Sequence, residues 1–140
     1  MLNMYKYYNI ENMNVDNKEV QKFNKISYSW WDPEGPFKPL HMLNPVRTNF
    51  IKNSVDLDYK SLIDVGCGGG LLCENLVSNN NKVTGIDMSE DAIEIAKTHK
   101  ALNNLDINYQ NISLENLIEK SNEKYDVLTC LELVEHVPDP

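Results

Sequence analysis

A cluster of four glycines at residues 66–70 constrains the fold of this chain more strongly than any other feature. The cluster follows a short apolar segment, 61–65, and precedes residues 71–77, in which Leu72 and Leu76 fall on one helical face. Glycine tolerates positive φ angles, and its missing side chain lets a ligand approach the backbone. The first N–H groups of a helix also have no partner within the helix. The sequence therefore predicts a strand, a tight loop and a helix that together bind a ligand.

Strands and helices alternate along the rest of the chain. Residues 82–87 form a second expected strand, and Ser89 is suited to cap the helix after it, on whose surface we place His99. The remaining expected elements are a strand at 107–110, a short helix from Ser113 to 118, and a fourth strand at 125–131. The fourth strand is apolar enough to be buried on both faces. This alternation predicts an α/β fold with a Rossmann-like, doubly wound parallel sheet.

The region before the first strand has a different pattern. Residues 1–17 resemble a flexible tail, and residues 18–57 an N-terminal helical cap. Within the cap, the apolar spacing predicts a helix at 18–30, on which Trp30 packs inward, and Pro39 is placed to open a second helix. The sheet region, 58–140, stops soon after the fourth strand, which would leave that strand as an open edge. We therefore expect a fold that is truncated after the fourth strand.

Composition excludes several classes of protein. The net charge of −8 argues against nucleic acid as a partner, because phosphate backbones bind to basic patches. No apolar run approaches the roughly 20 residues that span a bilayer. The three cysteines lack the C-x-x-C spacing of zinc or redox sites, which fits a reducing compartment.

The spacing of the glycines narrows the ligand class. A dinucleotide-binding loop has the pattern G-x-G-x-x-G, whose third glycine would fall here on Leu71. The chain instead has G-x-G-x-G, through Gly66, Gly68 and Gly70. Asp87, at the end of the second strand, is placed to accept hydrogen bonds from ribose hydroxyls. A nucleoside-type ligand is predicted, with a nicotinamide-dependent oxidoreductase as the alternative.

Residues 29–41, with the sequence SWWDPEGPFKPLH, and residues 44–47, NPVR, resemble the N-terminal signature of the ubiquinone-biosynthesis O-methyltransferases. The glycine loop, with Asp64 before it, resembles motif I of class I S-adenosylmethionine-dependent methyltransferases. The resemblance covers residues 15–140. It implies that residues 58–140 are the N-terminal half of a methyltransferase domain. It also implies O-methylation of 2-polyprenyl-6-hydroxyphenol and 3-demethylubiquinol intermediates.

The resemblance also implies a cofactor site for S-adenosylmethionine. The only arginine of the chain is suited to hold the methionine carboxylate of the cofactor, because a guanidinium can form two parallel hydrogen bonds. Leu131 stands where the family often has methionine, with similar volume. The expected cofactor-binding residues are Arg47, Asp64, Gly66, Gly68, Gly70, Asp87, Met88 and Leu131.

A run of titratable residues follows the fourth strand. The resemblance implies metal binding at Glu132, Glu135 and His136, with Mg²⁺ as a candidate second cofactor that would acidify a catechol hydroxyl. Glu132 and His136 are also the candidate catalytic residues, His136 as a general base near neutral pH. The alternative is that these side chains only brace the loop.

The implied substrate, a polyprenyl catechol or quinol, suggests where the protein works. We expect peripheral contact with a membrane surface, with other ubiquinone-biosynthesis enzymes as candidate partners. The expected location is the bacterial cytoplasm at the inner membrane, or the matrix face of the mitochondrial inner membrane. Two alternatives are a class I methyltransferase for another small molecule and an inactive truncated fragment of such an enzyme.

Overall fold

The computed structural model describes residues 14–139, so most of the predicted tail lies outside the described residues. Four parallel strands form one sheet in the order β3-β2-β1-β4. Their bounds are β1 Ser61–Val65, β2 Lys82–Asp87, β3 Ile107–Asn111 and β4 Val127–Thr129. The predicted doubly wound parallel sheet is confirmed, and β1 and β2 have the predicted bounds.

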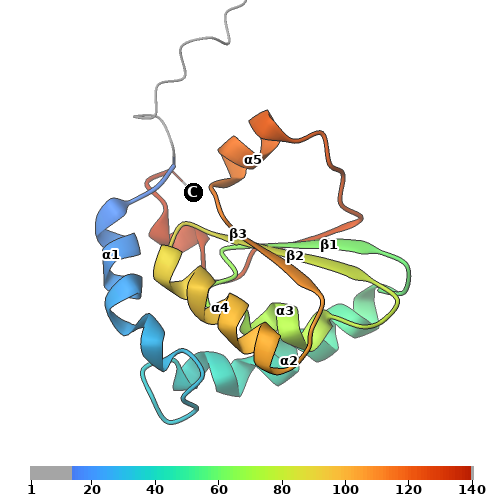
Figure 1. The fold of residues 1–140 in the computed structure, drawn as a ribbon, viewed down its shortest axis with the longest axis horizontal. Coiled ribbons are helices and arrows are strands. Elements are labelled where there is room, and N and C mark those ends of the chain that lie inside the picture. Colours follow the sequence, from blue (N-terminus) through green and yellow to red (C-terminus); the bar gives the residue numbers. More distant parts are fainter. Residues whose placement is uncertain (1–13, 140) are drawn as a thin grey trace, which may run out of the picture.

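Helices cover the two faces of this sheet unequally (Figure 1). The helix α2 (Lys38–Ser54), with α3 (Leu71–Leu76) and α4 (Glu90–Leu102), lies on one side, and α5 (Leu114–Lys120) lies on the other. The larger core joins α2, α3 and α4 to the strand residues Leu62, Val83 and Ile107. The smaller core joins Leu117 of α5 to Ile63 and Ile86. Alternate strand residues point to opposite faces, which explains why β1 contributes to both cores.

The cap begins with α1 (Asn17–Ile26) and the short 3₁₀ helix η2 (Ser27–Ser29), which replace the single predicted helix at 18–30. The serine hydroxyls explain the difference. Ser27 Oγ donates to the Asn24 carbonyl and Ser29 Oγ donates to the Ile26 carbonyl, at 2.9 and 2.7 Å. Such local bonds compete with the helical pattern. The second predicted helix is confirmed as α2, and Pro39 lies in its first turn.

The cap is fixed to the glycine loop through two tryptophans. Trp30 is buried and packs on the loop so closely that a Cβ atom at Gly69 would lie 2.3 Å from its ring. Trp31 donates from Nε1 to the Gly69 carbonyl at 3.1 Å and stacks on His99 with ring centroids 3.5 Å apart. His99 also contacts the carboxylate of Glu74 at 2.9 Å. His99, which was predicted on the helix surface, is thus partly covered by the cap, with 29% of its side chain exposed.

The fourth strand differs most from its prediction. β4 has three residues and lies at the edge of the sheet, paired only with β1. Leu128 is 57% exposed, so the prediction of burial on both faces was wrong. The cause is the thin cover on this side of the sheet, where α5 is the only α-helix among the described residues. None of the helices within residues 14–139 combines the length and the apolar character that a membrane-spanning helix needs.

Candidate functional site

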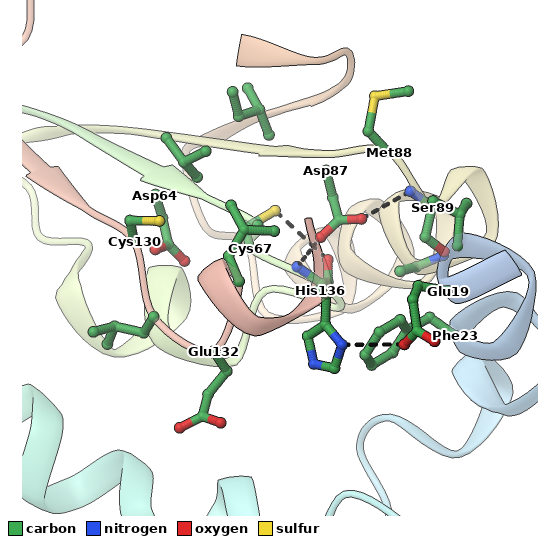
Figure 2. Close-up of a pocket in the computed structure, with 18 of the residues that line it drawn as sticks. Glu19, Phe23, Asp64, Cys67, Asp87, Met88, Ser89, Cys130, Glu132 and His136 are labelled. Atoms are coloured by element: carbon green, nitrogen blue, oxygen red, sulfur yellow. Dashed lines mark hydrogen bonds and ion pairs between the residues drawn. The ribbon is translucent and has the colours of Figure 1, made fainter. Parts of the chain in front are cut away.

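A cavity of about 610 Å³ lies at the carboxyl ends of β1, β2 and β4 (Figure 2). In a doubly wound sheet, this is the edge at which ligands bind. The glycine loop and the ends of the strands form its floor, and α1 and α2 of the cap form its wall. A cavity of this size is large enough for a nucleoside together with a small substrate.

The glycine loop has the conformation that its sequence predicts. Gly66, Gly68 and Gly70 have φ angles of 77°, 53° and 89°, which side chains with a Cβ atom rarely adopt. Gly66 N–H and Cys67 N–H both donate to the Ile86 carbonyl, at 2.9 and 3.0 Å, and this anchors the loop to β2. The backbone at Gly66 and Gly68 therefore lines the cavity without a side chain, and Gly70 leads into α3.

Asp87 ends β2 and fixes the other side of the loop. Its Oδ2 accepts from Gly68 N–H and its Oδ1 from Ser89 N–H, both at 2.8 Å. Burial raises the pKa of Asp87, while these backbone donors lower it and offset part of the shift. Each oxygen keeps a second lone pair, so the carboxylate can still accept hydroxyl groups of a ligand in the cavity.

Asp64 lies deeper, at the end of β1, and is 5% exposed. Thr129 Oγ1 donates to its Oδ1 at 2.6 Å, and Cys73 Sγ approaches its Oδ2 at 3.6 Å. Burial raises the pKa of Asp64 to about 6, against a smaller opposite effect of the Thr129 hydrogen bond. Asp64 therefore connects β1 to β4 beneath the cavity.

The remaining predicted cofactor residues also line this cavity. Met88 follows Asp87, Leu131 follows β4, and Arg47 reaches the cavity from α2. The Arg47 guanidinium forms an ion pair with Glu132, and the two side chains are 22% and 46% exposed. Seven of the eight residues predicted to bind the cofactor thus line this cavity. The eighth, Gly70, is the N-cap of α3 and is not part of the lining.

The titratable residues after β4 have separate partners. Glu132, with a left-handed φ of 55°, points towards α2 (Figure 2). His136 contacts Glu19 of α1 through Nδ1 at 3.1 Å and packs edge-on against Phe23. Glu135 is exposed and outside the cavity lining. Within residues 14–139, no three His, Cys, Asp or Glu side chains gather as a metal-binding group.

The contribution of α1 to the site was missed by the sequence reasoning. Glu19 and Phe23 line the cavity, and Ser89 Oγ, at the start of α4, donates to Asn24 Oδ1 of α1. These residues are polar or aromatic and have no motif spacing. The only available signal was the apolar face of α1, which predicted packing but not the packing partner.

Comparison with known proteins relates this geometry to one group of enzymes. Residues 62–140 match a family model described as a methyltransferase domain. A ubiquinone biosynthesis O-methyltransferase of Idiomarina loihiensis is 47% identical over 131 residues, 93% of this chain and 54% of that protein. Its namesake in Coxiella burnetii strain RSA 331 is 46% identical over 131 residues, 94% of this chain and 56% of that protein. The chain thus spans about half the length of these relatives.

Solved structures share the fold at low sequence identity. Magnesium protoporphyrin IX methyltransferase from Synechocystis PCC 6803, with bound S-adenosylmethionine (SAM), has a TM-score of 0.58 at 19% identity, over 90% of this chain and 54% of that chain. Coclaurine N-methyltransferase, bound to N-methylheliamine and S-adenosylhomocysteine (SAH), has a TM-score of 0.60 at 22% identity, over 67% of this chain and 28% of that chain. At these identities the likeness concerns the fold alone.

Proposed function

We propose that this chain, which belongs to the methyltransferase-domain family, acts in SAM-dependent O-methylation of polyprenyl catechol or demethylubiquinol intermediates. The observation that carries this proposal is the cavity itself. The glycine loop, the Asp87 carboxylate and the Arg47 guanidinium line one space at the carboxyl edge of the sheet. The substrate class rests on the relatives at 46–47% identity, which are named for ubiquinone biosynthesis.

The residues present fit SAM. Asp87 would accept the ribose hydroxyls, and the backbone at Gly66 and Gly68, where no Cβ atom intrudes, would hold the amino-acid part. Arg47 would bind the methionine carboxylate by charge-assisted hydrogen bonds. Met88 and Leu131 would supply apolar contacts. Asp64 and Gly70 would support the loop from β1 and from the start of α3, since neither needs to touch the ligand for the loop to keep its shape.

SAM, when bound, supplies an electrophilic methyl group. The protein then has to hold the catechol oxygen in line with it and remove a proton from the hydroxyl. His136 is the candidate base. With Nδ1–H donated to Glu19, the Nε2 atom of the neutral ring carries the lone pair that can accept a proton. Glu132 is the second candidate, because it lines the same cavity.

Magnesium does not fit the present arrangement. Glu132 is paired with Arg47 and His136 with Glu19, so the two side chains are held by different helices. A metal site at Glu132, Glu135 and His136 would require both pairs to open. Within the described residues, the side chains after β4 therefore do not form a site for Mg²⁺.

Apolar side chains from α1 and from the loop after β4 favour a hydrophobic substrate. Val20, Phe23, Leu133 and Val137 all line the cavity. A prenyl tail would bury apolar surface against them. Because such a substrate resides in lipid, we also propose peripheral contact with a membrane surface, in the bacterial cytoplasm or on the mitochondrial matrix face. Contact with other ubiquinone-biosynthesis enzymes belongs to the same proposal.

The test begins with the cofactor. Calorimetric titration with SAH should show binding by the wild-type chain, and Asp87→Ala should abolish it. Asp91→Ala removes an exposed carboxylate of α4 outside the cavity, and should bind like the wild type. Circular dichroism of both variants checks that the fold survives. A folded wild-type chain that does not bind SAH would contradict the proposed function.

The second measurement concerns the substrate. Transfer of a labelled methyl group from SAM to a demethylated quinol, but not to a catechol without a prenyl tail, would support the substrate class. His136→Gln should lower the rate most at neutral pH, if His136 is the base. Efficient methylation of unrelated small molecules in preference to quinols would favour the alternative of a methyltransferase with another substrate.

A further inference from the structure

The ion pair between Arg47 and Glu132 joins two distant parts of the chain inside the cavity. Arg47 comes from α2 of the cap, and Glu132 comes from the loop after β4, 85 residues later. Both residues line the cavity. A ligand that enters the cavity can therefore compete with either partner of this ion pair.

Arg47 has a special place in the electrostatics of this cavity. It is the only lysine or arginine among the described residues that line it. The same lining includes seven carboxylates: Asp16, Glu19, Asp64, Asp87, Glu115, Glu132 and Asp139. An anionic group of a ligand therefore finds one guanidinium to bind, and one of the carboxylates already holds it.

Glu132 is held in an unusual position. Its φ of 55° lies in the left-handed region, which is unfavourable for a residue with a Cβ atom. Backbone strain of this kind gathers at ligand sites and switches. The side chain is also 46% exposed, so it has room to move away from Arg47 without repacking a core.

We infer that Glu132 is an internal competitor for Arg47 and thereby sets the selectivity of the cavity for ligands that carry a carboxylate. In the ligand-free protein, Glu132 neutralises Arg47. A ligand carboxylate displaces it, and the freed Glu132 turns towards the open part of the cavity, where the acceptor substrate would lie. This inference rests on the proposed function, because it takes SAM and SAH as the carboxylate-bearing ligands.

Binding of two ligands tests whether Glu132 competes with a ligand carboxylate for Arg47. SAH carries the carboxylate, whereas 5′-deoxy-5′-methylthioadenosine has the same nucleoside without the amino-acid part. Glu132→Gln removes the charge that pairs with Arg47 and that repels an incoming carboxylate. We expect it to tighten SAH binding roughly three- to fivefold, as for the loss of a partly exposed ion pair, and to leave methylthioadenosine binding within about twofold.

Matched variants complete the experiment. Asp91→Asn makes the same change in charge on α4, outside the cavity, and should alter neither affinity. Arg47→Gln, which removes the cation, should reduce the preference for SAH over methylthioadenosine, and adding Glu132→Gln to it should then have a much smaller effect. Methylthioadenosine binding reports that each variant still has an intact nucleoside site.

The outcomes are distinct. Weaker or unchanged SAH binding in Glu132→Gln would overturn the proposal that Glu132 competes for Arg47, as would an equal gain in affinity for both ligands. In each of these cases the wild-type chain still binds SAH, so the proposed function stands. If the folded wild-type chain binds neither ligand, the proposed function fails, and the competitor fails with it.

Discussion

Two loops leave the carboxyl ends of the paired strands β1 and β4, and they are built in opposite ways. The glycine loop after β1 is buried and held by backbone N–H groups that donate to the Ile86 carbonyl and to the Asp87 carboxylate. The loop after β4 is half-exposed and held by side chains, through the pairs Arg47–Glu132 and Glu19–His136. One loop is fixed by its own sequence and its neighbouring strand, and the other by the distant cap.

The site therefore combines a rigid loop with a loop that can rearrange. Backbone bonds and close packing leave the glycine loop a single conformation, which suits a cofactor that every turnover uses in the same way. Exposed ion pairs contribute little stability and rearrange easily. The loop after β4 is therefore the part of the cavity that can respond to a ligand, and stability measurements should distinguish the two loops clearly.

The largest expected effect comes from a methyl group in the buried loop. In Gly68→Ala the new Cβ atom would lie 2.1 Å from Trp30, at a residue whose φ is 53°. Overpacking and backbone strain act together, so we expect a loss of about 3 kcal/mol or more in the free energy of unfolding. Denaturant titration followed by tryptophan fluorescence measures it.

The control for this variant is Gly35→Ala in the cap loop. Its Cβ atom would approach Asp32 only to 3.2 Å, and the residue has no positive φ. We expect a loss below about 1 kcal/mol. If Gly68→Ala were as mild as Gly35→Ala, the glycine loop would not be the rigid partner in this comparison.

A second, intermediate effect should come from the charge beneath the cavity. Burial raises the pKa of Asp64 from 3.8 to about 6 in the folded protein. The stability that this group contributes is thus complete below pH 3.8 and is lost as the pH rises through about 6. Asp64→Asn avoids the charge, and its advantage over the wild type should grow by about 2 kcal/mol between about pH 4.5 and pH 8.

Asp126 is a control, because its pKa is shifted in the opposite direction to that of Asp64. It is exposed, and hydrogen bonds from Ser61 N–H and Oγ lower its pKa. Asp126→Asn should therefore cost stability near neutral pH and recover as the pH falls through the lowered pKa. Thermal unfolding at a series of pH values measures both variants. If the free energy of unfolding had the same pH dependence in Asp64→Asn and in the wild type, ionisation of Asp64 would not destabilise the folded protein.

The same contrast explains what the sequence could predict. The strand β1, the glycine loop and the capping of α4 by Ser89 follow from residues close together in the chain, and all were predicted correctly. The resemblance based on residues 29–47 is confirmed by the relatives. The family match also favours the methyltransferase over the nicotinamide alternative, in agreement with Leu71 at the third loop position.

Long-range partners were beyond the reach of local patterns. Nothing near His99 indicates that Trp31 stacks on it, and nothing near His136 indicates Glu19, which lies 117 residues away. The exposure of Leu128 depends on how few helices cover the thin side of the sheet, a property of the whole fold. Apolar character alone did not show whether this strand lay at the edge.

The smallest expected effect tests the flexible side of the comparison. Glu19 is partly buried, with 24% of its side chain exposed, and hydrogen bonds with Lys22 and then with His136 lower its pKa. Glu19→Gln removes the charge from both contacts but keeps a hydrogen-bond acceptor, so the unfolding midpoint should barely move, and less in high salt than in low salt. Lys22→Gln, which disturbs only the partner on α1, is the control. If Glu19→Gln lost as much free energy of unfolding as Gly68→Ala, the contact with α1 would hold the loop after β4 rigidly. Both loops around the cavity would then be rigid, and neither could rearrange when a ligand binds.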